Sequence, residues 1–257
     1  MHPKAKSWHQ NESIMTFNQQ EDLLIIPDVH GRVFWRKALE EKQYKHVIFL
    51  GDYVDPYPQE GISPKDAFQE LVDIIDFARK NIGTTTMLLG NHDMHYMSDL
   101  FRQLAEGTRY SYNWQSELGP LFNENASLFQ LAYEADFEDT HCLFTHAGVS
   151  SVWYESHKEK VGELTADNLN KLMDDNDGIQ AISDVGYARG GWVKAGGILW
   201  ADLDEVNCAP LIEDVYQIFG HTQHRNGPTI NKTVACLDCR RAFLLSEVME
   251  LRDKAEE

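Results

Sequence analysis

Short apolar runs alternate with amphipathic stretches along the first half of the chain. Three runs of apolar and β-branched residues predict buried strands at 23–26, 47–50 and 85–89. Before the third of these, apolar residues recur at helical spacing after Ser63 and Pro64, which suit the cap and the first position of a helix. A further helix is predicted over 33–42. This alternation indicates βαβ units on a largely parallel sheet.

The second half of the chain begins with a mostly helical pattern over 91–132. Four strand patterns then follow, at 142–145, 216–219, 233–237 and 242–246. Helical segments lie between 150 and 185, and the last strands are closely spaced, which favours antiparallel pairing. We therefore expect an α/β sandwich in a single domain, with a core over about residues 22–248.

Composition and charge narrow the classes of function. The chain has 257 residues, of which 42% are hydrophobic and 25% charged, ordinary values for a globular protein. Its 41 acidic and 23 basic residues give a net charge of −18, which argues against nucleic acid as a partner. An anionic substrate then needs a local positive charge, and a bound metal ion is the obvious source.

The cysteines and the apolar runs indicate the compartment. Four scattered cysteines do not make a disulfide framework, and no signal peptide or membrane span is visible, so we expect a cytoplasmic protein. Cys236 and Cys239 have the spacing of a zinc or redox pair. The sequence has no second cysteine pair near them, and they lie in a predicted strand and in the turn after it. We therefore expect neither a zinc nor a redox role.

Polar residues gather where five of the predicted strands end. The five clusters are Pro27-Asp28-Val29-His30-Gly31, Gly51-Asp52-Tyr53-Val54-Asp55, Gly90-Asn91-His92-Asp93, Thr145-His146-Ala147-Gly148 and Gly220-His221-Thr222. Any one of them fits a turn or a helix cap, but five in succession indicate one site, because ligands bind at the carboxyl ends of strands in such sheets. Asp, Asn and His without thiolate suit Mn, Fe or Zn, and so many ligands favour two ions bridged by a carboxylate.

These motifs, in this order, resemble the signature of the calcineurin-like metallophosphoesterases. More narrowly, they resemble the phosphoprotein phosphatase branch, which includes bacterial and phage Ser/Thr phosphatases and the symmetrical diadenosine tetraphosphate hydrolases. Residues 197–202 are similar to the Leu-Trp segment of that branch. The resemblance covers residues 24 to about 246 and implies a central β-sandwich flanked by helices, with two divalent ions at the strand ends. Manganese is the expected metal, with iron and zinc as alternatives.

The resemblance also implies roles for single residues. Its metal ligands are Asp28 and His30 on the first ion, Asp52 bridging both, and Asn91, His146 and His221 on the second. The ions turn a shared water into hydroxide for attack on phosphorus. His92 then acts as the general acid, oriented by Asp55. A simple turn carboxylate is the alternative for Asp55.

Two positions depart from the family pattern. Position 223 is Gln, so the His that many members of the superfamily place there is missing, and His224 comes one residue too late. Position 56 is Pro, where the branch usually has an Arg that binds the substrate phosphate, and the loop after it looks inserted. The candidates to replace that cation are Arg189, Arg32 and Arg225. We prefer Arg189, which lies in a glycine-rich turn before Trp200.

The leading hypothesis is a phosphomonoesterase of the Ser/Thr protein phosphatase type, acting on a phosphorylated peptide or a small phosphoester. The alternative is a hydrolase of dinucleoside polyphosphates or other nucleotides. Tyr110, Tyr112 and Trp114 could stack on a nucleobase there, although such residues are more often in the core. A metal-binding scaffold without turnover is the third reading, which His92 beside the ligands disfavours. No membrane partner is expected, and the oligomeric state is open.

Overall fold

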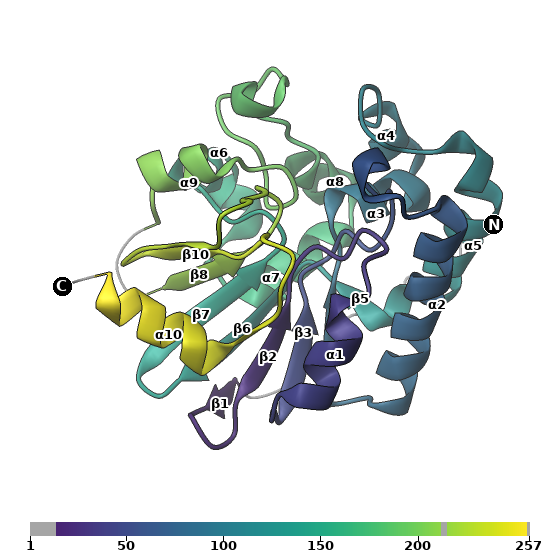
Figure 1. The fold of residues 1–257 in the computed structure, drawn as a ribbon. Helices are drawn as coiled ribbons and strands as arrows, with labels where there is room; N and C mark the ends of the chain where they lie inside the picture. Colours follow the sequence, from purple (N-terminus) through teal and green to yellow (C-terminus); the bar gives the residue numbers. More distant parts are fainter. Residues whose placement is uncertain (1–13, 212–214, 256–257) are drawn as a thin grey trace.

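Two β-sheets lie face to face at the centre of the molecule, and helices cover their outer sides (Figure 1). The computed structural model describes residues 14–211 and 215–255. One hydrophobic cluster fills the space between the sheets, and a second lies between the outer faces of both sheets and the helices that cover them. The predicted α/β sandwich flanked by helices is confirmed.

The first sheet contains the predicted N-terminal strands. Its order is β11 (Phe243–Leu244), β2 (Leu23–Ile26), β3 (His46–Phe49), β4 (Thr85–Leu88) and β5 (Phe129–Gln130). Strands β2 to β5 run parallel, and α1 (Phe34–Glu41) and α2 (Pro64–Lys80) connect the first three of them, as predicted. Because both faces of this sheet are covered, its strands are apolar on both sides, which explains their continuous apolar runs.

The second sheet is mixed rather than antiparallel. Its order is β1 (Met15–Phe17), β6 (Ala132–Phe137), β7 (Thr140–Thr145), β8 (Tyr216–Phe219), β10 (Val234–Cys236) and β9 (Thr229–Ile230). β6 and β7 pair antiparallel, but β7 pairs parallel with β8, and β8 with β10. The expectation of antiparallel pairing was wrong for these two pairs, because the long connections over 146–215 and 220–233 return the chain to the same end of the sheet.

Helices crowd one end of the sandwich. They are α3 (Asn91–Met97), α4 (Asp99–Gln103), α5 (Gln115–Glu124), α6 (Ser151–Val161), α7 (Ala166–Asn170), α8 (Asn176–Ile182) and α9 (Leu203–Cys208). Short 3-10 turns are η1 (Pro58–Glu60), η2 (Tyr112–Trp114), η3 (Ala126–Leu128), η4 (Lys171–Met173) and η5 (Tyr187–Arg189). Within the described part of the chain, no helix is both long enough and apolar enough to cross a membrane.

The last helix corrects one predicted strand. The strand expected over 242–246 ends at Leu244, and α10 (Leu245–Lys254) begins directly after it. The Glu247 side chain accepts a hydrogen bond from the backbone N–H of Leu244 at 2.9 Å, which stabilises the start of a helix.

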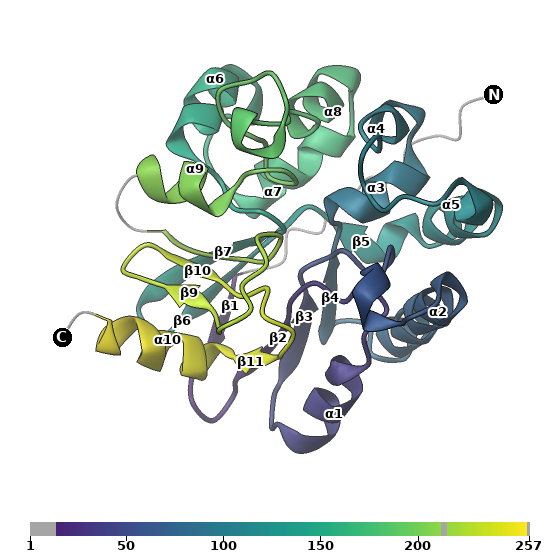
Figure 2. The same cartoon turned by 45° about the horizontal axis from the view of Figure 1, so that its top comes forward.

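The loops after β2, β3, β4, β7 and β8 meet between α6–α9 on one side and α3–α5 on the other (Figure 2). Two hydrogen bonds join the sheets at this point. His146 Nδ1, after β7, donates to the carbonyl oxygen of Leu50, after β3, at 2.8 Å. The His221 N–H, after β8, donates to the carboxylate of Asp28, after β2, at 3.0 Å. The five polar clusters therefore lie together at one edge of the sandwich.

Candidate metal centre

Asp28, His30 and Asp52 form the first group of possible ligands, and all three are buried. His30 Nδ1 donates to the carbonyl oxygen of Val54 at 2.7 Å, so the lone pair of its Nε2 remains for another partner. Nε2 lies 3.5 Å from Asp52 Oδ2 and 4.0 Å from Asp28 Oδ2. Burial lowers the pKa of His30 well below its ordinary value, which favours the neutral ring that metal binding requires.

Asp52, His146 and His221 form the second group, with Asn91 beside them. His146 Nε2 lies 3.5 Å from Asp52 Oδ2, 3.2 Å from Asn91 Oδ1 and 3.2 Å from His221 Nδ1. Asp52 Oδ2 is also the oxygen that faces His30, so one carboxylate lies between both groups. The structure thus brings all six predicted ligands together. The nitrogen and oxygen atoms that would bind metal mainly contact one another, and divalent ions between them would satisfy these polar atoms.

Strong electrostatic coupling marks these groups. Burial raises the pKa of Asp52, but the charges of His146 and His92 outweigh it and leave the pKa well below its ordinary value. Burial lowers the pKa of His146, yet Asp52 and Asp28 together raise it to about 10. The Asp52 carboxylate therefore favours positive charge beside it, as the bridging position of a cation site requires.

The backbone is strained at four predicted site residues. His30, Asp52, Asp55 and His221 have φ angles of 45°, 51°, 57° and 63°, in the left-handed region that non-glycine residues rarely adopt. Such a conformation costs roughly 1–3 kcal/mol per residue and persists where surrounding contacts enforce it. Here it turns the chain sharply after the strands and directs the side chains into the site.

Two glycines of the motifs make room for carboxylates. A Cβ on Gly90 would lie 2.1 Å from Asp52 Oδ1, and a Cβ on Gly220 would lie 2.0 Å from Asp28 Oδ1. Neither distance is possible without a shift of the ligand. Glycine is therefore required at these positions because the backbone passes so close to the carboxylates.

His92 is fixed on two sides. Its backbone N–H donates to Asp52 Oδ1 at 2.9 Å, and its Nδ1 lies 2.7 Å from Asp55 Oδ2. The other oxygen of Asp55 accepts a hydrogen bond from the hydroxyl of Tyr96 at 2.5 Å. The predicted pairing of His92 with Asp55 is thus present in the geometry. Tyr96 was missed, although it lies four residues after His92, one turn further along α3.

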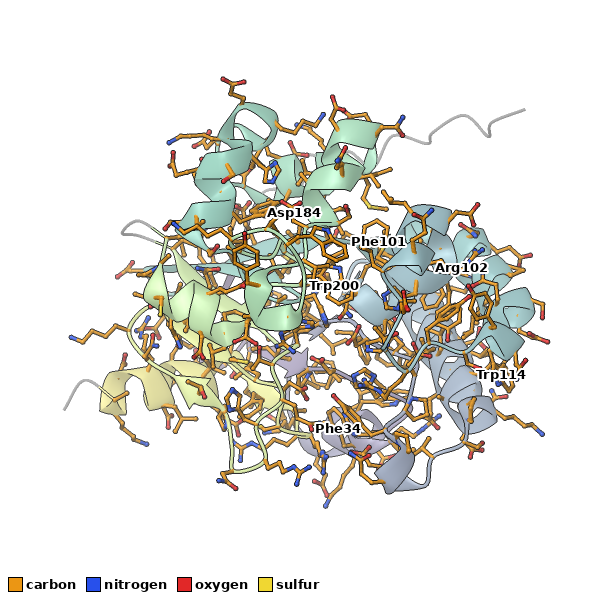
Figure 3. All side chains as sticks on the ribbon, turned by 90° about the horizontal axis from the view of Figure 1, so that it is seen from above. Phe34, Phe101, Arg102, Trp114, Asp184 and Trp200 are labelled. Carbon is orange, nitrogen blue, oxygen red and sulfur yellow. The ribbon has the colours of Figure 1, made fainter. Side chains whose placement is uncertain are left out.

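A cavity of about 160 Å³ opens at these groups. Its wall is formed by His30, Asp52, Tyr57, Asn91, His92, Thr108, Arg109, Arg189, Trp200 and His221. Figure 3 views the molecule from above, with Trp200 near the middle of the picture. A larger hollow of about 400 Å³, bordered by α6 and residues 193–195, contains none of the predicted ligands. The smaller cavity is therefore the candidate site.

Two arginines reach this cavity wall, Arg189 and Arg109. Arg189 was predicted; its Nη2 donates to Thr222 Oγ1 at 2.6 Å and its Nε lies 2.8 Å from Asp202 Oδ2. Arg109 was missed. It follows none of the strands and belongs to no motif, so only its place in the fold reveals it.

The other two predicted arginines are not on the wall. Arg32 is buried, with its Nε 2.7 Å from Glu60 Oε2 and its Nη1 donating to the carbonyl oxygen of Asp28 at 3.1 Å. Its guanidinium is therefore occupied by the protein itself. Arg225 is exposed and does not line the cavity.

The cysteine pair and the aromatic cluster lie outside the candidate site. Cys236 is buried and Cys239 half-buried, both thiols are free, and burial raises the pKa of Cys239 to about 11. Among the described residues, neither belongs to a possible metal group. Tyr110 packs against Tyr96, Trp114 packs against Phe68, and Tyr112 is exposed.

Comparison with known proteins identifies the class. The family model of the calcineurin-like phosphoesterases matches residues 22–225, so the chain belongs to this family. It is a metal-dependent phosphoesterase, a hydrolase of a family that typically uses two metal ions, and its Asp/His groups can bind metal. No curated protein matches the sequence.

Two solved structures share the fold at low sequence identity, and a third is similar with a lower score. A cold-active protein-tyrosine phosphatase of a psychrophilic Shewanella species has 17% identity and a TM-score of 0.51, over 90% of this chain and 78% of that chain. A further structure of a cold-active protein tyrosine phosphatase has 15% identity and a TM-score of 0.50, over 90% and 76%. A serine/threonine phosphatase from Saccharomyces cerevisiae has 12% identity and a TM-score of 0.46, over 87% and 70%.

Proposed function

We propose that the protein is a cytoplasmic phosphomonoesterase of the Ser/Thr protein phosphatase type that uses two manganese ions. The observation that carries this proposal is the position of Asp52. Its Oδ2 lies 3.5 Å from the Nε2 atoms of both His30 and His146, so two ligand groups share one carboxylate beside the His92–Asp55 pair. Shared carboxylates of this kind are typical of two-metal phosphatases.

The ligands divide between two ions. Asp28 and His30 would hold the first, Asp52 would bridge both, and Asn91, His146 and His221 would hold the second. When bound, two such ions lower the pKa of a shared water and neutralise charge on the phosphoryl oxygens. Oxygen and imidazole donors without thiolate suit manganese, with iron and zinc as alternatives.

His92 supplies the proton for the leaving oxygen. Because Nδ1 is bonded to Asp55, Nε2 is the nitrogen left to hold a proton on the cavity wall. Asp55 is buried and accepts from both His92 and Tyr96, which favours an orienting role over that of a simple turn residue. Its charge stabilises the protonated imidazole, and the Tyr96 hydroxyl holds the carboxylate in position.

Arg189 is the predicted arginine that we retain as a contact for the substrate phosphate. Asp202 and Thr222 hold its guanidinium, and it lines the cavity together with Trp200. We no longer propose Arg32 or Arg225 for this role, since neither lines the cavity.

The alternative, cleavage of dinucleoside polyphosphates, has lost its main support. None of the three aromatic residues suggested for a nucleobase lines the cavity, and Tyr110 and Trp114 pack against other core-facing rings. A phosphoryl group with its leaving group outside fits the small volume of the cavity better.

Phosphate release by the manganese-loaded protein tests the proposal. We would compare a phosphoserine peptide, a phosphotyrosine peptide and diadenosine tetraphosphate, with chelator as the control. Faster turnover of the phosphoserine peptide is the expected result. Preference for phosphotyrosine would overturn the Ser/Thr assignment, and preference for the dinucleotide would overturn the phosphomonoesterase assignment.

A further inference from the structure

Arg109 differs from Arg189 and Arg32 because no carboxylate of the described residues pairs with it. Arg189 pairs with Asp202 at 2.8 Å, and Arg32 with Glu60 at 2.7 Å. Within residues 14–211 and 215–255, Arg109 has no ion pair with an Asp or Glu. In a chain with a net charge of −18, a half-buried guanidinium without such a partner has its charge available for an anionic ligand.

Three contacts set the position of this guanidinium. Its carbon lies 3.7 Å from the ring centroid of Tyr57, close enough for a cation–π interaction. Its Nε donates to the carbonyl oxygen of Asp55 at 2.9 Å, and its Nη2 lies 3.1 Å from His30 Nε2. Tyr57 also contacts the His30 ring edge to face, at 5.1 Å between centroids. Nη2 of Arg109 therefore lies beside a candidate metal ligand.

We propose that Arg109 binds the phosphoryl oxygens of the substrate, and that Tyr57 positions its guanidinium. The proposal rests on the proposed function, since it assumes that a phosphoester enters this cavity. A guanidinium offers parallel N–H donors that match phosphate oxygens. If His30 Nε2 held a metal ion, that nitrogen would not accept from Arg109, and the Nη2 N–H groups would be available to the substrate.

This assignment also explains the unusual sequence after Asp55. The carbonyl group that accepts the hydrogen bond from Arg109 belongs to Asp55, directly before Pro56. Pro56 has no positive charge, and Arg109, 54 residues after Asp55, brings a guanidinium to this place instead. Tyr57, next in the loop, stacks on that arginine. Glu60, further along the loop, forms an ion pair with Arg32, whose side chain does not line the cavity. The loop and Arg109 thus form one phosphate-binding feature.

The test compares phosphate binding by four variants of the manganese-loaded protein. Arg109→Ala removes the guanidinium, Arg109→Lys keeps the charge but not the parallel donors, and Tyr57→Leu and Tyr57→Phe remove or keep the aromatic ring. Arg79→Ala is the control, because it deletes the same charge from an exposed position on α2. Calorimetric titration with inorganic phosphate is measured first, then kcat/KM for p-nitrophenyl phosphate. Metal content and thermal stability show that each variant is intact.

We expect Arg109→Ala to weaken phosphate binding and to lower kcat/KM by roughly 100-fold, the combined effect of two charged hydrogen bonds, with metal content unchanged. The phosphate affinity of Arg109→Lys should lie between those of the parent and Arg109→Ala. Tyr57→Phe should bind phosphate like the parent, and Tyr57→Leu should bind it several-fold more weakly. Arg109→Ala that binds phosphate as tightly as Arg79→Ala, or that loses its metal, overturns the proposal. If the parent binds phosphate through Arg109 but hydrolyses no phosphoester, the proposed function fails while the assignment of Arg109 stands.

Discussion

Replacement of His92 by asparagine tests whether its ring delivers a proton to the leaving group. The substitution removes Nε2 but keeps the backbone N–H that donates to Asp52 Oδ1 at 2.9 Å. Asp55 keeps its hydrogen bond from Tyr96. The metal ligands are therefore left in place, and we expect both ions to remain bound.

The size of the effect depends on the leaving group. For an alkyl phosphate such as phosphoserine, the departing oxygen needs a proton, and loss of a general acid costs about 10²–10⁴-fold in rate. This corresponds to about 3–5 kcal/mol of transition-state stabilisation. For p-nitrophenyl phosphate the leaving group departs readily as an anion, so the loss should be far smaller. The lost contact with buried Asp55 should lower the free energy of unfolding by about 1–3 kcal/mol.

The assay is kcat with each of the two substrates, for parent and His92→Asn, together with metal content by mass spectrometry. A large loss with the phosphoserine peptide and a small loss with p-nitrophenyl phosphate is the predicted pattern. Equal losses on both substrates would refute the general-acid role. Loss of metal from the variant would show instead that His92 supports the ligands.

Three further predictions concern the ligands and the stability of the fold. Asp52→Asn should reduce the content of both metal ions, because Asp52 Oδ2 faces both ligand groups; an unchanged content would contradict a bridging role. Gly220→Ala should destabilise the fold by roughly 1–3 kcal/mol and weaken metal binding, because its Cβ would lie 2.0 Å from Asp28 Oδ1; a melting temperature and metal content like those of the parent would disprove this steric argument. Burial lowers the pKa of His46 to about 4, so between that pH and the ordinary value near 6.5 the unfolded chain binds a proton that the folded chain does not. Stability should therefore fall by about 3 kcal/mol as the pH drops through this range, and much of this fall should vanish in His46→Gln. Identical pH profiles of the unfolding free energy, measured in chelator, would reject that explanation.

The place of the candidate metal centre could be predicted because the relevant pattern is local. An apolar run followed at once by Asp, Asn or His identifies a strand end, and parallel strands bring such ends to one edge of a sheet. Asp28 and His221, 193 residues apart, follow strands of different sheets, and they meet because the two sheets pack with these strand ends at the same edge of the sandwich. The resemblance to a known family then supplied a role for each residue.

The rest of the site depends on tertiary packing that no local pattern encodes. Arg109 lies in an irregular stretch, and its proposed role rests on contacts with Tyr57 and Asp55 that are made when the loops come together. The sequence favoured Arg189 over Arg32 and Arg225 because of its glycine-rich turn, but which of the three side chains lines the cavity is seen only in the fold. The close spacing of the later strands suggested antiparallel pairing, which was wrong for β7 with β8 and for β8 with β10. Their parallel pairing depends on connections that return the chain to the same end of the sheet.

The two hydrogen bonds that join the sheets at the candidate metal centre connect early and late parts of the chain. His146 reaches Leu50, and His221 reaches Asp28, only after both sheets have formed and met. When only the first half of the chain has been synthesised, it contains Asp28, His30 and Asp52 but lacks the histidines of the second group. The full set of candidate ligands therefore comes together only in the finished sandwich, and an incomplete chain does not carry it.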